Sequence, residues 1–211
     1  MYEIEHFNED RLAVQQALVE KHPLGLLICN DDNGRSVANP VPFTLDRNSG
    51  ERGTLKAHLA RPNSQWRLLQ AAADCLVVFQ GAEAYISPNW YPTKKVHGKV
   101  VPTWDYMIVQ IRGKPVVHQD PDWLRAQIEH LTARHEASQP KPWKVDDAPP
   151  RFTKAMLNGI VGIEIPITEI HGKWKLSQNR SVQDVAGVRD GLTEVGELGL
   201  AAEVASRIRE D

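Results

Sequence analysis

Apolar and polar residues near the start of the chain follow a pattern that predicts an antiparallel hairpin. Leu24 to Cys29 is an apolar run of strand length. The turn at 31–34, Asp-Asp-Asn-Gly, favours a tight hairpin because Asn and Gly accept positive φ. Val37 to Leu45 then returns antiparallel. Pro40 and Pro42 remove two amide donors from it, so this strand is expected at the edge of a sheet or at a bulge.

Further strands are predicted in the middle and towards the end of the chain. Thr54 to Leu59 alternates apolar and polar residues as a half-buried strand does. Asp74 to Phe79 is a β-branched and aromatic run, and Gly81 is expected to separate it from a second short strand. Tyr106 to His118 predicts a long strand, interrupted near its end by Gly-Lys-Pro, and Ile160 to Ile167 a final one.

Helices are predicted around these strands. They are recognised by a helical spacing of apolar residues, by N-cap residues, or by Pro in the first turn. The expected helices cover 8–21, 64–70, 120–136, 152–157, a segment that starts at Ser181, and the tail 193–209.

This arrangement of elements predicts the fold class. Strands outnumber helices in the centre, hairpin turns join them, and no regular strand-helix alternation occurs. The sequence therefore predicts an α+β fold that is mainly β, an antiparallel barrel with peripheral helices. Residues 1–180 are expected to form the barrel domain with inserted helices, and residues 181–211 a C-terminal helical extension packed on the same domain.

Composition narrows the possible partners. The chain has 211 residues with 25 basic and 27 acidic side chains and a net charge of -2, so no overall positive field attracts DNA. Cys29 and Cys75 lie in apolar strands and are expected to be buried free thiols. No basic and apolar leader begins the chain, and no apolar run approaches the ~18 residues of a membrane span. The protein is therefore expected to be cytoplasmic, without a membrane partner.

The candidate site is the aromatic, proline-punctuated stretch 80–92. It joins Gln80, Tyr85 and Ser87 to Trp90 and Tyr91, and Thr103-Trp104 brings a second set of rings and hydroxyls. Rings with polar groups at their rim suit a flat, polar-edged ligand. The alternative is a rigid surface loop packed on the barrel.

Phosphate recognition without a glycine-rich loop requires basic side chains and hydroxyl donors. The sequence provides basic residues at Arg61, Lys94, Lys95, Lys175 and Arg180, although each alone is typical of a solvated surface charge. The common nucleotide-loop, hydrolase and zinc-protease motifs are absent from the sequence. No metal site and no catalytic pair is predicted. His58, on a strand, is either a core histidine or a ligand contact, while His130 and His135 favour a solvated surface.

Four segments together resemble one known family. They are 58–63 with Trp66, 77–91, 101–106 and 175–180. In this order they are similar to the PaiB-like, FMN-binding negative transcriptional regulators. The resemblance implies a flavin-reductase-like split barrel, shared with pyridoxamine-phosphate oxidases, and a homodimer with an FMN site at each end of the subunit interface.

The resemblance also implies the cofactor-binding residues. Arg61, Thr93 and Lys94 are assigned to the phosphate, and a partner subunit is expected to contribute Lys175, Ser177 and Gln178. Tyr85, Ser87, Trp90 and Trp104 are assigned to the flavin ring. The other expected FMN contacts are His58, Trp66, Gln80, Tyr91, Thr103 and Arg180.

Three functions remain open at this point. The resemblance favours an FMN-binding regulator, and the lack of an obvious acid-base pair favours sensing over catalysis. The alternatives are an FMN-dependent oxidoreductase that acts on a small substrate, and a haem-binding or haem-degrading split barrel. No basic recognition helix is evident. DNA contact would therefore need a local basic patch, either Lys94, Lys95 and Lys99 or Arg207 and Arg209.

Overall fold

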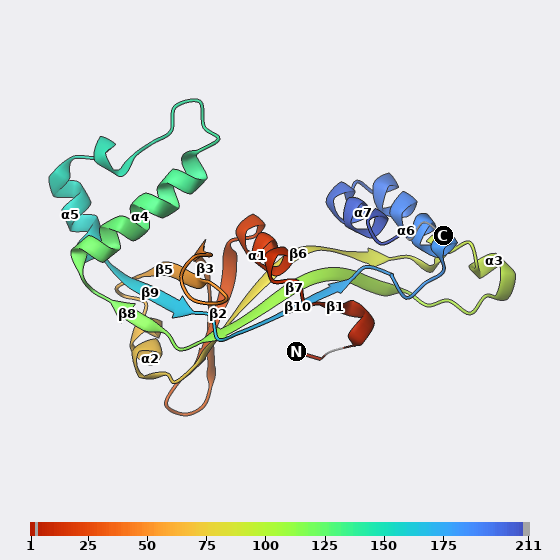
Figure 1. Cartoon of the computed structure of the whole chain (residues 1–211), viewed down its shortest axis with the longest axis horizontal. Coiled ribbons are helices and arrows are strands. Elements are labelled where there is room, and N and C mark those ends of the chain that lie inside the picture. Colours follow the sequence, from red (N-terminus) through yellow and green to blue (C-terminus); the bar gives the residue numbers. More distant parts are fainter. Residues whose placement is uncertain (3, 209–211) are drawn as a thin grey trace. The chain divides into compact units, whose positions relative to one another are not determined.

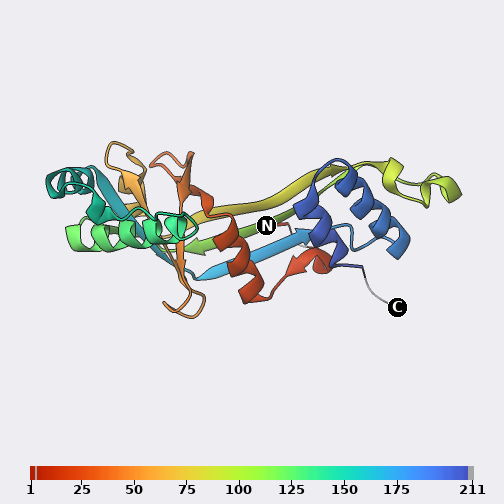
Figure 2. The same ribbon diagram turned by 90° about the horizontal axis from the view of Figure 1, so that it is seen from above.

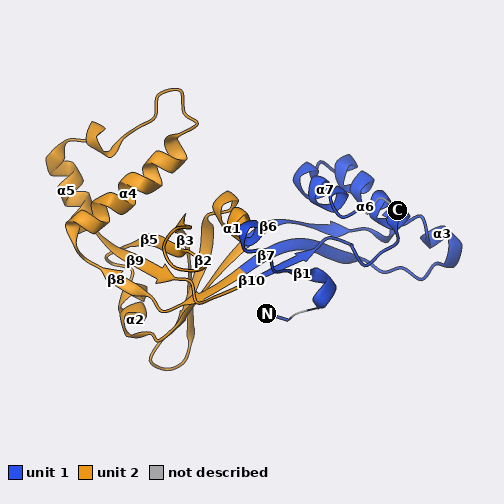
Figure 3. Cartoon of the chain, viewed as in Figure 1, with its two compact units in different colours: residues 1–15, 80–109, 171–211 blue, residues 16–79, 110–170 orange. Residues whose placement is uncertain are grey.

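The computed structural model describes residues 1–2 and 4–208. The chain forms two compact units, which Figure 3 colours separately. Unit 1 comprises residues 1–15, 80–109 and 171–211, and unit 2 comprises residues 16–79 and 110–170. Each unit is therefore built from segments that are distant in sequence.

The elements follow one another as labelled in Figure 1. The strands are β1 (Asn8–Glu9), β2 (Leu24–Asn30), β3 (Ser36–Pro42), β4 (Thr44–Asp46), β5 (Thr54–Ala60), β6 (Cys75–Ile86), β7 (Thr103–Gly113), β8 (Val116–His118), β9 (Ile160–Pro166) and β10 (Glu169–Lys175). The α-helices are α1 (Leu12–Lys21), α2 (Gln65–Ala71), α3 (Lys94–His97), α4 (Pro121–Glu136), α5 (Pro150–Asn158), α6 (Val182–Glu194) and α7 (Leu198–Ala205). Short 3₁₀ turns are η1 (Glu5–Phe7), η2 (Pro88–Trp90) and η3 (Val145–Asp147).

The strands form two open sheets, in the orders β1-β10-β7-β6-β2-β3 and β4-β5-β9-β8. In unit 2, β5 pairs antiparallel with β9 along its whole length, from Thr54 opposite Pro166 to Ala60 opposite Ile160. Leu55, Ala57 and Leu59 alternate inward along β5 and are buried. The opposite face of β5 therefore presents Lys56 and His58, both partly exposed.

The predicted hairpin is confirmed. Asp31 Oδ1 accepts hydrogen bonds from the amides of Asn33 and Arg35, and Gly34 takes φ of +75°. The strands on either side pair from Asn30 opposite Ser36 to Leu24 opposite Pro42. β3 ends the sheet order, as its two prolines predict.

Helix α4 is held against the β5-β9 sheet of unit 2. Asp120 caps its first turn by accepting from the amides of Asp122 and Trp123, as the sequence predicts. Trp123 fills the space above Gly162 of β9, where an added Cβ would overlap the indole ring. A glycine in this strand therefore creates the space in which a large aromatic side chain packs.

In unit 1, helix α6 packs on the aromatic loop. Ser181 Oγ accepts from the Asp184 amide at the start of α6, which confirms the predicted cap. Cβ atoms added to Gly187 and Gly191 of α6 would overlap the Trp90 carbonyl and the Trp90 ring. Helices α6 and α7 lie side by side (Figures 1 and 2). The glycines of α6 thus permit close packing against η2.

Several predicted boundaries are wrong. Helix α1 begins at Leu12, because Asn8 and Glu9 pair with β10 instead, and an added Cβ on Gly172 of β10 would lie only 2.7 Å from the Glu9 carbonyl. Strand β10 itself was not predicted from the sequence. Gly81 does not divide the strand either, since β6 continues to Ile86.

The tail is also divided differently from the prediction. α6 and α7 are separate helices, with Gly196 at φ of +88° between them. Arg209, at the end of the predicted tail helix, lies outside the described residues. The division into residues 1–180 and 181–211 stays a prediction.

The fold class is confirmed as α+β with antiparallel sheets, which do not close into a barrel. Cys29 and Cys75 are buried free thiols, as predicted, and burial raises the pKa of Cys75 to about 12. Across the described part of the chain, no helix has the length and apolar character to cross a bilayer. Nor do three or more His, Cys, Asp or Glu residues gather there as metal ligands.

Candidate functional site

The predicted cofactor residues are divided between the two units. His58, Arg61 and Trp66 belong to unit 2, and the remaining predicted contacts belong to unit 1. Unit 1 therefore contains both the aromatic loop and the 175–180 segment, and the contacts between them can be followed within one compact body.

The aromatic loop is fixed at both ends. Ser87 Oγ accepts from the Asn89 amide and caps η2. Thr93 donates its hydroxyl to both carboxylate oxygens of Asp184, at 3.0 and 2.8 Å, and its amide donates to the same group. Because Asp184 is buried on α6, this helix helps to hold the aromatic loop in place.

Two of the rings assigned to the flavin remain exposed. Tyr85 of β6 and Trp104 of β7 form an edge-to-face pair with centroids 6.2 Å apart. Their exposed fractions are 48% and 53%, which is high for large aromatic side chains. Gln80, earlier on β6, is exposed as well. The structure thus brings Tyr85 and Trp104 together as an apolar surface available to a ligand or to another chain.

The 175–180 segment is joined to β7 by a polar cluster. Lys175 Nζ donates to Thr103 Oγ1 at 2.6 Å and to the Trp104 carbonyl. It also lies 3.4 Å from Asp105 Oδ1. Ser177 Oγ donates to Asp105 Oδ2 at 2.6 Å. Ser177 takes φ of 59°, a left-handed conformation that is uncommon outside glycine, asparagine and aspartate.

Asp105 is the centre of this cluster and was not among the predicted site residues. Its side chain is fully buried, and desolvation raises its pKa above 3.8 although Ser177 and Lys175 act in the opposite direction. The sequence contained a signal, because Asp105 shares the inward face of β7 with Met107, Val109 and Ile111. A charged residue at such a position needs hydrogen-bond partners.

Gln178 and Arg180, later in the 175–180 segment, also contact other parts of the protein. Gln178 Oε1 accepts from the Leu176 amide at 2.7 Å, and its Nε2 donates to the carbonyls of Trp174 and His6. The Arg180 guanidinium lies 5.0 Å from the centroid of the Tyr91 ring, within cation-π range. Gln178 therefore shapes the backbone of the segment, whereas Arg180 places a positive charge over the buried Tyr91 ring.

The predicted basic patches differ in their surroundings. Lys94 and Lys95, on the short helix α3, are exposed, as is Lys99 just beyond it. Lys94 Nζ donates to Asn89 Oδ1 at 2.5 Å. Arg207, in the second patch, lies 3.5 Å from Glu9 Oε2, and Arg209 is outside the described residues. The positive charges around α3 are therefore the more accessible of the two sets.

In unit 2, Arg61 is tied to neighbouring segments. Its Nε donates to the Asn158 carbonyl, Nη1 to Gln119 Oε1 and Nη2 to the Ile160 carbonyl, at 2.7 to 3.0 Å. Arginine has five N–H donors, so two remain for a ligand. Trp66 donates its indole N–H to the Arg61 carbonyl at 3.0 Å.

His58 has a hydrogen-bond partner on α4. Its Nδ1 lies 2.8 Å from Gln127 Oε1. The ring is half-buried on β5. This contact agrees with a structural histidine, and the second ring nitrogen leaves a ligand contact open as well.

The donor set in the chain fits FMN. A flavin ring requires flat apolar surface, and a phosphate requires positive charge with N–H or O–H donors. Tyr85 and Trp104 present exposed ring surface, and Lys94 and Lys95 present exposed charge. Arg61 keeps N–H groups beyond those that it donates within the protein.

Open antiparallel sheets with peripheral helices place the chain in the split-barrel class of folds. A family described as "Putative FMN-binding domain" matches residues 1–169. The chain belongs to this family, which confirms the resemblance predicted from its motifs.

Relatives and solved structures agree with this assignment. The chain is 31% identical over 174 residues to protease synthase and sporulation protein PAI 2 of Bacillus subtilis, covering 82% of this chain and 80% of the relative. The flavocytochrome Anf3 of Azotobacter vinelandii has a similar fold, with a TM-score of 0.62 and 11% identity over 82% of this chain and 72% of that one. The FAD and heme binding protein of Mycobacterium smegmatis gives a TM-score of 0.57 and 18% identity over 84% and 77%. At these identities the two structures support the fold alone.

Proposed function

We propose that the protein is a homodimeric FMN-binding regulator of transcription. The observation that carries the proposal is the match of an FMN-binding family over residues 1–169. When bound, FMN supplies reversible acceptance of electrons. The chain itself binds the ring and the phosphate.

The exposed apolar side chains of unit 1 support the dimer. Besides Tyr85 and Trp104, Val96 and Val101 are 80% and 63% exposed. A second copy that covered these groups in a two-fold arrangement would bury them symmetrically. In this proposal Lys175, Ser177 and Gln178 approach the FMN of the partner. Sedimentation showing a stable monomer at micromolar concentration would contradict the dimer.

The first experiment is a titration of the purified protein with FMN, followed by flavin fluorescence and visible absorbance. Saturable binding of one FMN per subunit is the expected result. Haem is titrated in parallel. A haem absorbance band without FMN binding would show that haem, not flavin, is the ligand. Consumption of reduced nicotinamide by the FMN-loaded protein would favour an oxidoreductase over a regulator.

Replacing Arg61 with alanine tests the phosphate assignment. If the two remaining N–H groups of Arg61 bind the phosphate, the substitution weakens FMN binding by about 1.5–3 kcal/mol, the range of a hydrogen bond to a charged group. Fluorescence titration measures the change. Arg61→Lys keeps the charge but loses the planar fork, so its affinity is expected between those of alanine and wild type.

The matched control for this substitution is Arg112→Ala in the same unit. Arg112 is exposed and paired with Asp74, at 2.6 Å, and has no assigned role in binding. Thermal denaturation of each variant separates lost affinity from lost stability, because Arg61 also holds two backbone carbonyls. Equal FMN affinity in Arg61→Ala and Arg112→Ala would remove Arg61 from the site.

The regulatory part of the proposal rests on the resemblance to negative regulators and on the exposed lysines near α3. It is tested by incubating the protein with fragmented genomic DNA of its own organism, with and without FMN, and sequencing the retained fragments. We expect specific fragments whose retention depends on FMN. Retention should also fall when Lys94, Lys95 and Lys99 are changed together to glutamate, because phosphate contacts depend on positive charge. Uniform retention of all fragments would exclude sequence-specific regulation.

A further inference from the structure

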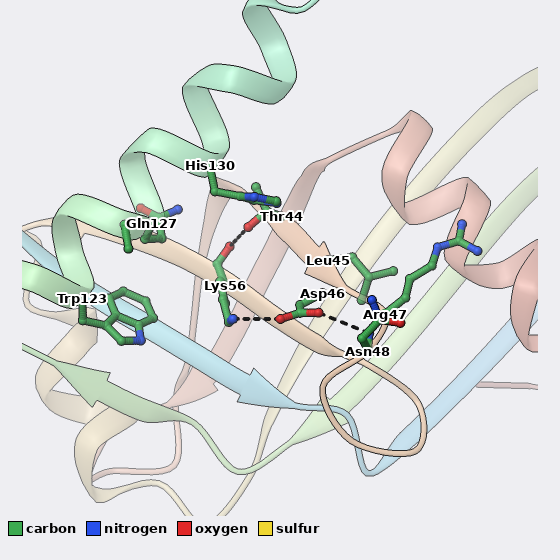
Figure 4. Close-up of a pocket in the computed structure, with 10 residues that line it drawn as sticks. Thr44, Leu45, Asp46, Arg47, Asn48, Lys56, Trp123, Gln127 and His130 are labelled. Carbon is green, nitrogen blue, oxygen red and sulfur yellow. Dashed lines mark hydrogen bonds and ion pairs between the residues drawn. The ribbon is translucent and has the colours of Figure 1, made fainter. Parts of the chain in front are cut away.

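Unit 2 contains a cavity that involves none of the predicted cofactor residues. It has a volume of about 540 Å³, which is within the usual range for small-molecule sites. Its walls come from β4, the turn after it, β5 and α4 (Figure 4). The lining residues are Thr44, Leu45, Asp46, Arg47, Asn48, Lys56, Trp123, Ala126, Gln127 and His130.

One wall of the cavity is a rigidly held aromatic ring. The Trp123 ring stacks on His118 with centroids 4.2 Å apart and an interplanar angle of 8°. Its indole N–H donates to Glu164 Oε2 at 3.2 Å, and Gly162 leaves no room for the ring to move towards β9. Leu45 and Ala126 add apolar surface. The cavity therefore offers a fixed flat surface on which a planar ring can stack.

The second feature is a buried amide with an unused donor. Gln127 is only 4% exposed. Its Oε1 is paired with His58 Nδ1 at 2.8 Å, which fixes the side chain on the cavity wall. Its Nε2 has no hydrogen-bond partner within residues 1–2 and 4–208. An unpaired buried donor costs about 1–3 kcal/mol, and a ligand oxygen would remove that cost.

The third feature is a cationic donor. Lys56 Nζ is paired with Asp46 Oδ2 at 3.0 Å, and this contact holds the ammonium beside the cavity (Figure 4). Arg47 is paired with Glu20, which is not part of the lining. Arg47 is therefore neutralised by Glu20, whereas Lys56 keeps N–H donors beyond the one that it gives to Asp46. The wall thus offers a cationic donor to an anionic oxygen.

We propose that this cavity binds a small planar aromatic carboxylate, whose ring lies against Trp123 and whose carboxylate accepts hydrogen bonds from Gln127 Nε2 and Lys56 Nζ. Lys56 has three N–H donors and shares one with Asp46, so it can serve both carboxylates. The flat ring matches the Trp123 wall, and the carboxylate oxygens match the N–H donors of Gln127 and Lys56. The lining contains none of the proposed FMN residues, although His58, one of them, is the partner of Gln127, and the cavity adds a second ligand to the protein.

The test compares two probes by isothermal titration calorimetry on the full chain saturated with FMN. 2-Naphthoate carries the required ring and carboxylate, and 2-naphthamide is a neutral molecule of similar shape. Wild-type protein is expected to bind one 2-naphthoate per subunit at least about tenfold more tightly than the amide, since each tenfold step corresponds to about 1.4 kcal/mol. Failure of 2-naphthoate to bind in the presence of FMN, with binding in its absence, would assign the cavity to the flavin and overturn the inference.

Gln127→Glu places a negative charge in the wall without a change in size. The affinity for 2-naphthoate should fall by at least about tenfold, and the affinity for 2-naphthamide should stay within about twofold of wild type. Gln139→Glu makes the same change at an exposed position just after α4. It should change the affinity for neither probe. If Gln127→Glu does not fold, Lys56→Gln tests the same point by removal of the cation. Unchanged 2-naphthoate binding in a folded cavity variant, or no binding to wild type with or without FMN, would overturn the inference.

Discussion

Gly191→Ala is expected to destabilise the protein by about 2 kcal/mol. A Cβ at this position of α6 would overlap Cγ, Cδ2 and Cε2 of Trp90. Overpacking of this kind costs typically about 1–3 kcal/mol and sometimes more, while alanine in place of glycine in a helix returns up to about 1 kcal/mol. The clash dominates because the overlapped atoms include Cγ at the base of the Trp90 side chain, and Gly187 brings α6 equally close to the Trp90 carbonyl.

The matched control is Gly199→Ala in α7. An added Cβ there meets nothing within 4 Å, so only the gain in helix propensity remains, and this variant should be slightly more stable than wild type. Urea denaturation of both variants, followed by tryptophan fluorescence, measures the difference. Equal stability of the two variants would show that α6 does not pack on Trp90 as described. FMN affinity should fall in Gly191→Ala alone if the aromatic loop binds the ring.

Local rules predicted much of the fold. The hairpin at 31–34, the edge position of β3 and the cap at Asp120 follow from side chains that act on their own backbone. Strand β10 and the continuous β6 do not follow from such rules. Gly172 and Gly81 disfavour a strand locally by about 0.5–1 kcal/mol each, and pairing with neighbouring strands, which no local pattern encodes, outweighs that cost.

The candidate site was predicted only in part, because local patterns again do not encode long-range contacts. The rings at Tyr85 and Trp104 could be selected from the sequence because aromatic and hydroxyl residues cluster there with prolines. The carboxylates that organise the site, Asp105 and Asp184, act on residues far along the chain, Ser177 and Thr93. Their importance depends on long-range contacts. Only the position of Asp105 on the inward face of a strand indicates such a role from sequence.

Asp105→Ala is expected to destabilise the protein by about 3 kcal/mol. The substitution leaves Ser177 Oγ and the partly buried Lys175 Nζ without their shared acceptor, and breaking a buried pair by removal of one partner costs up to about 3–5 kcal/mol. The control is Asp74→Ala, which removes an exposed ion pair with Arg112 and should cost less than about 1 kcal/mol. Denaturation at pH 7 compares them. A loss in Asp105→Ala no larger than in Asp74→Ala would show that the 175–180 segment does not depend on Asp105.

The pH dependence of stability provides an independent test of the same carboxyl. Because burial raises the pKa of Asp105 above 3.8, the folded protein holds its proton more tightly than the unfolded chain does. The resulting stabilisation is complete below about pH 3.8 and is lost as the pH rises through the folded-state pKa. Asp105→Asn cannot titrate at this position. Its stability relative to wild type should therefore rise between about pH 3.8 and the folded-state pKa of Asp105, and stay constant at higher pH. A difference that falls with pH would mean that the Lys175 and Ser177 contacts outweigh burial, and that the cluster favours the charged form of Asp105.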